Sequence, residues 1–125
     1  MDPLDHDHRV DPAGVDAARA VLISPAQAQR LARLLSLVAD PVRSRILIAL
    51  GSAAELCVGD LALALDCTQD ATSYALRLLR TAGLVADRRD GRVVFYRLAD
   101  GFPHSLVEHC LRQLLTIAPG AGGQA

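Results

Sequence analysis

The sequence predicts a mainly α-helical domain with a β-hairpin wing, that is, a winged helix-turn-helix, in a homodimeric protein. Three observations lead to this prediction. Apolar residues recur at helical spacing in segments between residues 24 and 82. Two strand-like runs then flank Asp90-Gly91, a dipeptide typical of a tight hairpin, and a further helical pattern follows Pro103. Helices, a hairpin and a final helix in this order are typical of a winged helix-turn-helix.

The composition indicates one globular domain. The chain has 125 residues, of which 51% are hydrophobic and 22% charged, so a single packed core is expected. The three cysteines are widely spaced and odd in number, which argues against a disulfide framework. No apolar run is long enough to span a membrane, and the acidic start lacks the apolar core of a signal peptide. We therefore expect a cytoplasmic protein with no membrane partner.

The domain is expected to have an extension at each end. Residues 1–23 are predicted to form a flexible N-terminal arm, with a short helix over 14–23. Residues 24–117 are expected to form the winged helix-turn-helix and dimerisation domain. Its start is placed at Ser24-Pro25, because this pair combines a helix cap with a first-turn proline. Residues 118–125 have the composition of a disordered tail.

Within the domain, four helices are expected before the hairpin. They run from Ser24-Pro25 to Asp40, from Pro41 to Gly51, over 56–65, and over 69–82. Thr68 is expected to cap the fourth, and Gly83 to close it. Their apolar residues at helical spacing are Leu31, Leu34, Leu35, Val38, Val42, Ile46, Leu47, Leu50, Leu76, Leu78 and Leu79.

The hairpin is predicted to pair Leu84–Arg88 with Arg92–Leu98. Pro103 then opens a last helix with an apolar face made of Leu106, Val107, Cys110, Leu111, Leu114 and Leu115. The first long helix and this last helix carry more apolar surface than one small core requires. We therefore expect these two helices to form a two-fold dimer interface.

Charge and helix position together predict binding to double-stranded DNA. The formal net charge is −1, yet residues 77–97 hold six arginines and two aspartates, a local charge of +4. The start of the fourth helix would enter the major groove. The predicted base-facing residues are Thr68, Gln69, Thr72, Ser73 and Tyr74. The predicted phosphate-facing residues are Arg77, Arg80, Arg88, Arg89 and Arg92. For the last three, which flank the hairpin tip, the alternative is a solvated wing.

Four motifs resemble the ArsR/SmtB family of metal-responsive repressors. They are ADPVRSRILIAL (39–50), ELCVGDLA (55–62), TSYALRLLRTAGLV (72–85) and DGRVVFYRLAD (90–100). The resemblance runs from about Ser24 to Leu115. It implies a homodimeric winged-helix repressor that leaves its operator when an effector ion binds.

The resemblance also implies a metal site at ELCVGDLA. Cys57 and Asp60 match one version of the family's cysteine motif, whereas Gly59 stands where the thiophilic version has a second cysteine. The partner's N-terminal arm would complete the site, and His6 and His8 are the donors we expect there, with Asp7 and Asp11 also available. One thiolate with imidazoles and a carboxylate suits zinc best, with cadmium, cobalt, nickel or mercury as further candidates. The alternative is a purely structural Cys57 and Asp60.

A second metal site of the family, across the last helix, is expected to be absent here. Asp100 is present, but Phe102 and Gln113 stand where that site has histidines. A rearranged site around His104, Glu108 and His109 remains an alternative.

Two other functions remain open at this point. Cys57, Cys67 and Cys110 are candidates for a cysteine-based sensor of mercury, cadmium, arsenic or an oxidant, although Cys67 and Cys110 are also expected as core residues. A winged-helix module that binds a protein is the alternative outside DNA binding, since Asp70 lies near the start of the predicted recognition helix. An enzyme is not expected, because the sequence has no nucleophile–base pair and no phosphate-binding loop.

Overall fold

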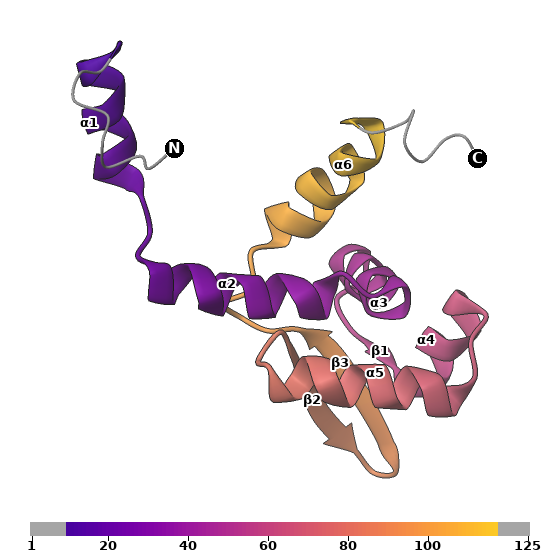
Figure 1. The fold of residues 1–125 in the computed structure, drawn as a ribbon. Helices are drawn as coiled ribbons and strands as arrows, with labels where there is room; N and C mark the ends of the chain where they lie inside the picture. The colour runs from indigo at the N-terminus through magenta and orange to yellow at the C-terminus, as the bar shows by residue number, and fades with distance from the viewer. Residues whose placement is uncertain (1–9, 118–125) are drawn as a thin grey trace. The chain divides into compact units, whose positions relative to one another are not determined.

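The structure is a computed structural model in which residues 10–117 are described. Its elements are α1 (Pro12–Val21), α2 (Pro25–Val38), α3 (Pro41–Ser52), β1 (Leu56–Cys57), α4 (Val58–Leu65), α5 (Gln69–Thr81), β2 (Val85–Asp90), β3 (Val93–Leu98), the π-helical segment η2 (Leu106–Leu111) and α6 (Arg112–Ile117) (Figure 1). The chain divides into two compact units, Met1–Arg33 and Leu34–Ala125, with the boundary inside α2. The predicted tail, 118–125, lies outside the described residues.

Helices α2 and α3 both start where the sequence predicted, and side-chain caps stabilise both starts. The Ser24 hydroxyl accepts a hydrogen bond from the Gln27 amide at 3.1 Å, and the Gln27 side chain accepts one from the Ser24 amide at 2.9 Å. This reciprocal pair is a capping box. At α3 the Asp40 carboxylate accepts from the amides of Val42 and Arg43 at 3.0 and 2.9 Å. Both predicted helix starts are therefore confirmed.

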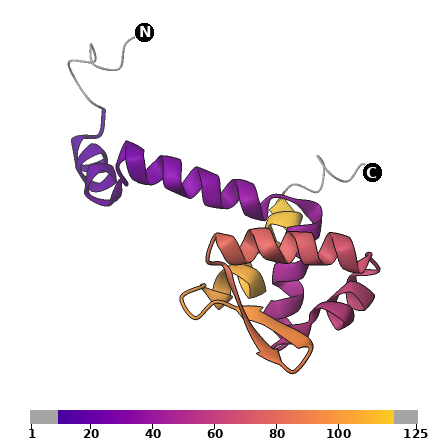
Figure 2. The same ribbon diagram turned by 90° about the horizontal axis from the view of Figure 1, so that it is seen from below.

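The core lies between α3, α4, α5 and the sheet, all within the second unit. Figure 2 shows α5 crossing α3, and the two helices pack against each other. The side chains with no exposed surface include Ile46, Leu47, Leu61, Leu76 and Leu79. The predicted apolar stripe of the second helix is thus confirmed, as are Leu76 and Leu79 of the fourth, whereas Leu78 is only half-buried. Leu31, Leu34 and Leu35 of α2 differ, because they are 39–52% exposed in the single chain.

The segment predicted as a helix from Leu56 begins as a strand, so that expectation was wrong at its start. Leu56 and Cys57 pair antiparallel with Tyr96 and Phe95, which gives a three-stranded sheet of order β1-β3-β2. Helix α4 begins only at Val58, with Cys57 as its N-cap. The free edge of β3 supplies this pairing, and such a long-range partner overrides local helix propensity.

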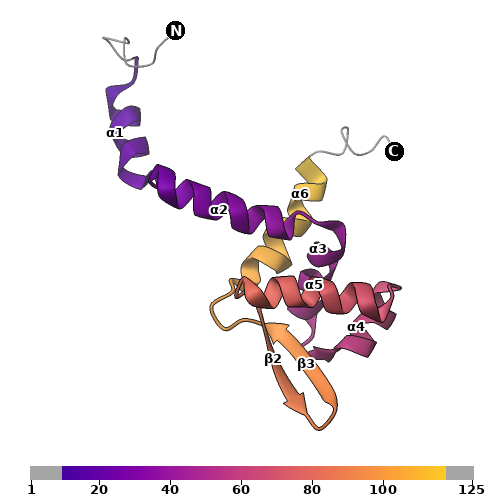
Figure 3. The same ribbon diagram turned by 60° about the horizontal axis from the view of Figure 1, so that its bottom comes forward.

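The predicted hairpin is confirmed, but its first strand extends to Asp90, closer to the turn than expected, and its second strand begins at Val93 and not at Arg92. Asp90 pairs with Val93, so the turn consists of Gly91 and Arg92. Gly91 has a φ of +64°, a conformation that glycine adopts without steric strain. The hairpin projects beyond the helices of the second unit, as a wing does (Figure 3). Among residues 10–117, no helix has both the length and the apolarity that crossing a membrane requires.

Gly51 was expected to end α3, but the helix continues through it to Ser52. A Cβ atom on Gly51 would lie 2.7 Å from Cγ1 of Val107 and 3.3 Å from its Cβ. The glycine therefore permits a close approach between α3 and η2. Val107 is buried, as predicted for the last helix, whereas Cys110, Leu114 and Leu115 on the predicted stripe are exposed in the single chain.

Replacing Gly51 with alanine is expected to destabilise the protein. Alanine favours a helix interior by about 1 kcal/mol over glycine, but overpacking against a stiff valine costs about 1–3 kcal/mol. Urea unfolding at a fixed protein concentration would measure the net loss. The double variant Gly51→Ala/Val107→Ala should lose less free energy of unfolding than the sum of the losses in the two single variants, because shortening Val107 removes the clash. Additive losses would show that the contact is not tight.

Candidate nucleic-acid interface and metal centre

Helices α4 and α5 are joined by the tight turn of a helix-turn-helix. Asp66 takes the left-handed conformation, with a φ of 56°, which aspartate tolerates better than most residues. The Cys67 amide donates to the Ala62 carbonyl at 3.0 Å, which closes α4. The Thr68 hydroxyl accepts from the Ala71 amide at 3.1 Å and so caps α5, as predicted. Gly83, with a φ of +81°, follows the end of α5.

One face of α5 is available to a partner. Gln69, Ser73, Tyr74, Arg77 and Arg80 recur at spacings of three and four residues, and all but the half-buried Ser73 are exposed. Tyr74 is 57% exposed, and the Arg77 guanidinium lies 5.8 Å from the centre of its ring. The opposite face, which includes Leu76 and Leu79, is buried in the core. Polar and aromatic side chains of this kind can contact base edges and phosphates.

Thr72 does not belong to this face, so its assignment as a base-facing residue was wrong. Its side chain is completely buried, and its hydroxyl donates to the Thr68 carbonyl at 2.8 Å. The sequence pattern suggested Thr72 because threonine is polar. The helical register places it between core residues, where its hydroxyl is satisfied within the helix.

The wing carries several arginines in different environments. Arg89 and Arg92 are exposed and sit near or in the turn. Arg80 of α5 approaches Asp87 of β2, with Nη1 3.4 Å from Oδ2, and both side chains are partly exposed. An exposed pair of this kind contributes little to stability, so it leaves Arg80 able to exchange partners.

Arg88 is held by two partners. Its Nε donates to both oxygens of the Glu55 carboxylate at 3.0 Å, and its Nη2 donates to Oε1 of the same group. Its guanidinium also lies 4.5 Å from the centre of the Phe95 ring, which is its cross-strand partner. The hydrogen bond from Arg88 lowers the pKa of the Glu55 carboxyl below its ordinary value. At a pH above its ordinary pKa, the ionised Glu55 carboxylate therefore stabilises the folded state. This stabilisation is lost as the pH falls through the lowered pKa of the folded protein.

Cys57 and Asp60 lie together where α4 begins. The Cys57 Sγ accepts from the Asp60 amide at 3.5 Å, the thiol is half-buried and Asp60 is exposed. A thiolate and a carboxylate on one helical turn fit half of a tetrahedral zinc site. The other expected ligands, His6 and His8, lie outside the described residues.

The three cysteines do not gather into one site within the chain. Among the described residues, no three His, Cys, Asp or Glu side chains lie close enough to hold a metal ion. Cys67 packs against the core, with its Sγ 3.6 Å from the Leu65 carbonyl oxygen, which agrees with a core role. Cys110 lies on the predicted apolar stripe but is exposed in the single chain, so it does not pack into the core of this chain.

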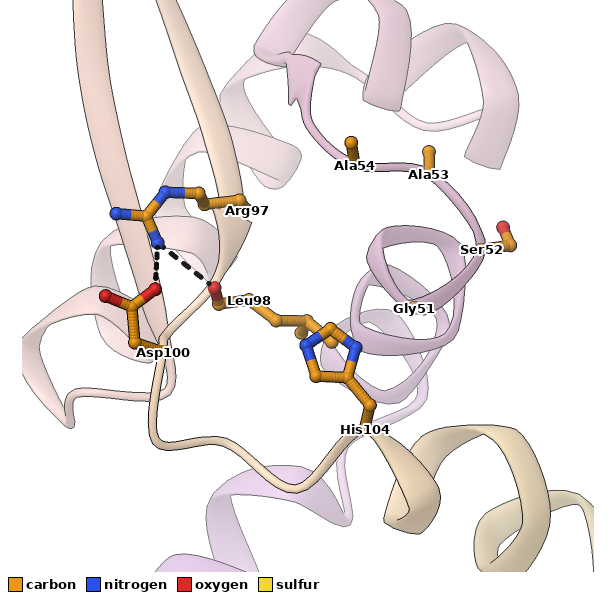
Figure 4. A pocket seen from close by; sticks show the side chains of 8 residues that line it. All are labelled: Gly51, Ser52, Ala53, Ala54, Arg97, Leu98, Asp100 and His104. Carbon is orange, nitrogen blue, oxygen red and sulfur yellow. Dashed lines mark hydrogen bonds and ion pairs between the residues drawn. The ribbon is translucent and has the colours of Figure 1, made fainter.

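A depression of about 360 Å³ lies between the end of α3, the end of β3 and the start of the last helix (Figure 4). His104 lines it, together with Arg97 and Asp100. Arg97 Nη1 donates to the Asp100 carboxylate at 3.1 Å and is 3.4 Å from the Leu98 carbonyl. The guanidinium of Arg97 therefore already engages the Asp100 carboxylate, which disfavours a cation beside it. The side chain of Glu108, the acid of the rearranged metal site considered above, lies outside the described residues.

A second depression, of about 250 Å³, joins the two candidate surfaces. Its lining includes Cys57, Gln69 from α5, and Arg92 from the wing turn. Sequence reasoning did not foresee this proximity, because it arises when β1 pairs with β3. For the same reason it assigned no role to Glu55 or Phe95. No local pattern could have signalled the contacts of these two residues with Arg88.

Comparison with known proteins identifies relatives with this architecture. A sequence model described as "Bacterial regulatory protein, arsR family" matches residues 40–87. The chain is 50% identical over 74 residues to the transcriptional repressor SmtB homolog of Synechocystis sp., a match covering 59% of this chain and 55% of that protein. It is 32% identical over 103 residues to the cadmium resistance transcriptional regulatory protein CadC homolog of Staphylococcus aureus, covering 82% and 80% of the two proteins.

A solved structure gives the same result for the fold. The transcriptional repressor BigR from Xylella fastidiosa matches with a TM-score of 0.62 and 32% identity, over 74% of this chain and 90% of that chain. These comparisons confirm the winged helix-turn-helix. They also confirm that the chain is not an enzyme, because the family and its named members are regulators. The chain belongs to the ArsR/SmtB family of bacterial transcriptional regulators.

Proposed function

We propose that the protein is a cytoplasmic transcriptional repressor that binds operator DNA as a homodimer and is released by a metal ion. The exposed polar face of α5 carries the DNA-binding part of this proposal. That face enters the major groove, where Thr68, Gln69, Ser73 and Tyr74 lie nearest to the bases. The exposed arginines of α5 and of the wing turn contact phosphates, namely Arg77, Arg80, Arg89 and Arg92.

The dimer rests on exposed apolar side chains of α2 and α6. Leu31 and Leu35 are 46% and 52% exposed, and Leu114 and Leu115 are 57% and 76% exposed. Apolar side chains exposed along a helix mark an interaction surface, and a second copy of the chain is the partner that gives a two-fold arrangement. Such a dimer presents two α5 helices to a palindromic operator.

The effector site comprises Cys57 and Asp60 of one protomer, completed by His6 and His8 from the N-terminal arm of its partner. A mixed sulfur, nitrogen and oxygen set favours zinc, and it also accepts cadmium, cobalt or nickel. The relatives include a cadmium resistance regulator, which supports a metal effector. Cys57 lines the same depression as Gln69 and Arg92, which are two of the proposed DNA-contacting residues. Metal binding at Cys57 would therefore take place next to the DNA-binding surface. This proximity supports coupling between the two sites.

The central test is fluorescence anisotropy of the protein with a duplex from upstream of its own gene, using zinc, cadmium, cobalt, nickel, mercury and arsenite with a chelator control. We expect zinc or a similar ion to weaken operator binding. Cys57→Ser should bind the operator without metal but lose the response, because it lacks the thiolate ligand. Cys110→Ser, which alters an exposed cysteine away from the proposed site, should respond like the wild type. An unchanged response in Cys57→Ser would refute the site.

Truncation tests the remaining ligands. Deletion of residues 1–10 should abolish the response to zinc and leave metal-free operator binding intact, since the histidine donors are lost. Release only by mercury or arsenite, with the truncated protein still responsive, would favour a cysteine-based sensor, for which the exposed Cys110 is the supporting observation. Absence of operator binding at low salt would favour a protein-interaction module.

A further inference from the structure

The contacts of Arg88 set it apart from the other wing arginines. Its guanidinium makes hydrogen bonds to both carboxylate oxygens of Glu55, whereas Arg89 and Arg92 have no ion-pair partner among the described residues. Planar, paired hydrogen bonding to a carboxylate uses the same donors that would grip a phosphate. Arg88 therefore cannot keep its Glu55 contacts and bind a phosphate with the same N–H groups.

The geometry fixes Arg88 more firmly than a surface ion pair alone would. The Phe95 ring lies beneath the guanidinium at 4.5 Å, and the two residues are paired across β2 and β3. Stacking on an aromatic face adds to the ion pair and restricts the side chain. The Glu55 side chain is only 27% exposed, so both partners of Arg88 are partly shielded from solvent.

Glu55 lies outside the hairpin, so its contact with Arg88 attaches the hairpin to a different segment of the chain. It directly precedes β1, and β1 pairs with the edge of β3. Arg88 belongs to β2, the other outer strand of the sheet. The Glu55–Arg88 pair thus links the residue before β1 to β2, and Arg88 stacks on Phe95 of the central strand. These three residues form what we call the wing clamp.

We propose that Glu55 is a positioning residue of the DNA-binding surface, which holds the wing through the wing clamp and withholds Arg88 from DNA phosphates. This inference rests on the proposed DNA binding and adds to it an acidic residue, Glu55, that limits which arginines contact phosphates. Arg88 then stabilises the wing through its contacts with Glu55 and Phe95, and the phosphate contacts of the wing are made by Arg89 and Arg92. The salt dependence of binding is consequently smaller than the number of wing arginines suggests.

Operator affinity measured as a function of salt concentration tests the withholding. Each phosphate contact contributes about 0.9 to the slope of log affinity against log salt. For each protomer, Glu55→Ala should steepen the slope by about 0.9, because Arg88 becomes free. Arg88→Gln should leave the slope unchanged, whereas the matched control Arg92→Gln should reduce it by about 0.9.

A double-mutant cycle separates the wing clamp from simple charge removal. In the Arg88→Gln background, Glu55→Ala should have no further effect on the slope or affinity, because its effect acts through Arg88. An equal effect of Glu55→Ala in both backgrounds would overturn the inference while leaving the proposed function intact. A wild-type protein that shows no salt-dependent operator binding would overturn the proposed function and the withholding together.

The wing clamp itself is tested without DNA by side-chain NMR on the full chain. The Nε–H group of Arg88 should exchange slowly with solvent in the wild type and rapidly in Glu55→Ala, because its acceptor is removed. The Nε–H group of Arg89 should exchange rapidly in both proteins. Rapid exchange of Arg88 in the wild type would overturn the wing clamp, whatever the result of the DNA experiment.

Discussion

Replacing Leu76 with alanine is expected to lower the free energy of unfolding by about 2–5 kcal/mol. The side chain has no exposed surface and lies on the face of α5 that packs into the core with α3 and α4. Removing it loses the transfer free energy of three carbon atoms and leaves a cavity that a close-packed interior fills only partly. Because small domains are stable by about 5–15 kcal/mol, the variant would retain little reserve. Urea unfolding followed by circular dichroism, at a fixed protein concentration, measures the loss.

Leu63→Ala is the matched control for this experiment. Leu63 lies on α4 and is 81% exposed, so the same truncation there removes little buried area. Its effect should stay within about 0.5 kcal/mol. Similar losses at Leu63 and Leu76 would mean that Leu63 is buried in solution, for example by a partner, or that Leu76 is not in the core.

The double variant Gln69→Ala/Tyr74→Ala is expected to lose most of its preference for operator over unrelated DNA. Both side chains are exposed on the first half of α5, the part that a major groove would receive. A well-placed base contact contributes about 1–3 kcal/mol of discrimination, so two lost contacts should lower the preference at least about tenfold. Competition anisotropy with operator and scrambled duplexes at one salt concentration measures the ratio.

Arg89→Gln provides the contrast for this prediction. A phosphate contact carries no sequence information, so this variant should weaken binding to both duplexes by a similar factor. Unchanged discrimination in Gln69→Ala/Tyr74→Ala would place base recognition elsewhere. In that case the exposed face of α5 would not be a reading surface, and the DNA-binding part of the proposed function would need a different helix.

Elements specified by neighbouring residues could be predicted well. The caps at Ser24 and Thr68 act over three residues, and each was found where expected. The Gly91 turn is equally local. The prediction failed where a distant segment decided the outcome. Leu56 is in a strand because β3 offers it an edge, and α3 continues through Gly51, where the glycine leaves room for Val107 of the last helix.

The candidate site shows the same division. The polar content of α5 and the Cys57-x-x-Asp60 spacing were evident from the sequence, but exposure was not. Thr72 is as polar as Ser73, yet the helical register buries it, and no property of the residue itself reveals that. Arg88 has the same chemistry as Arg89, but only Arg88 faces Glu55 across the sheet.

By itself, the sequence determined the winged helix-turn-helix, the positions of most helices and the family, because helix caps, apolar periodicity and the Asp-Gly turn act over a few residues. Only the tertiary structure decided which polar residues are free to contact a partner. It brought Glu55 to Arg88, and Cys57 into one depression with Gln69 and Arg92. These contacts depend on the pairing of β1 with β3, which joins Leu56 to Tyr96 and Cys57 to Phe95, residues far apart in the sequence. A pairing over such a distance is set by the packing of the whole domain and leaves no mark in the local sequence.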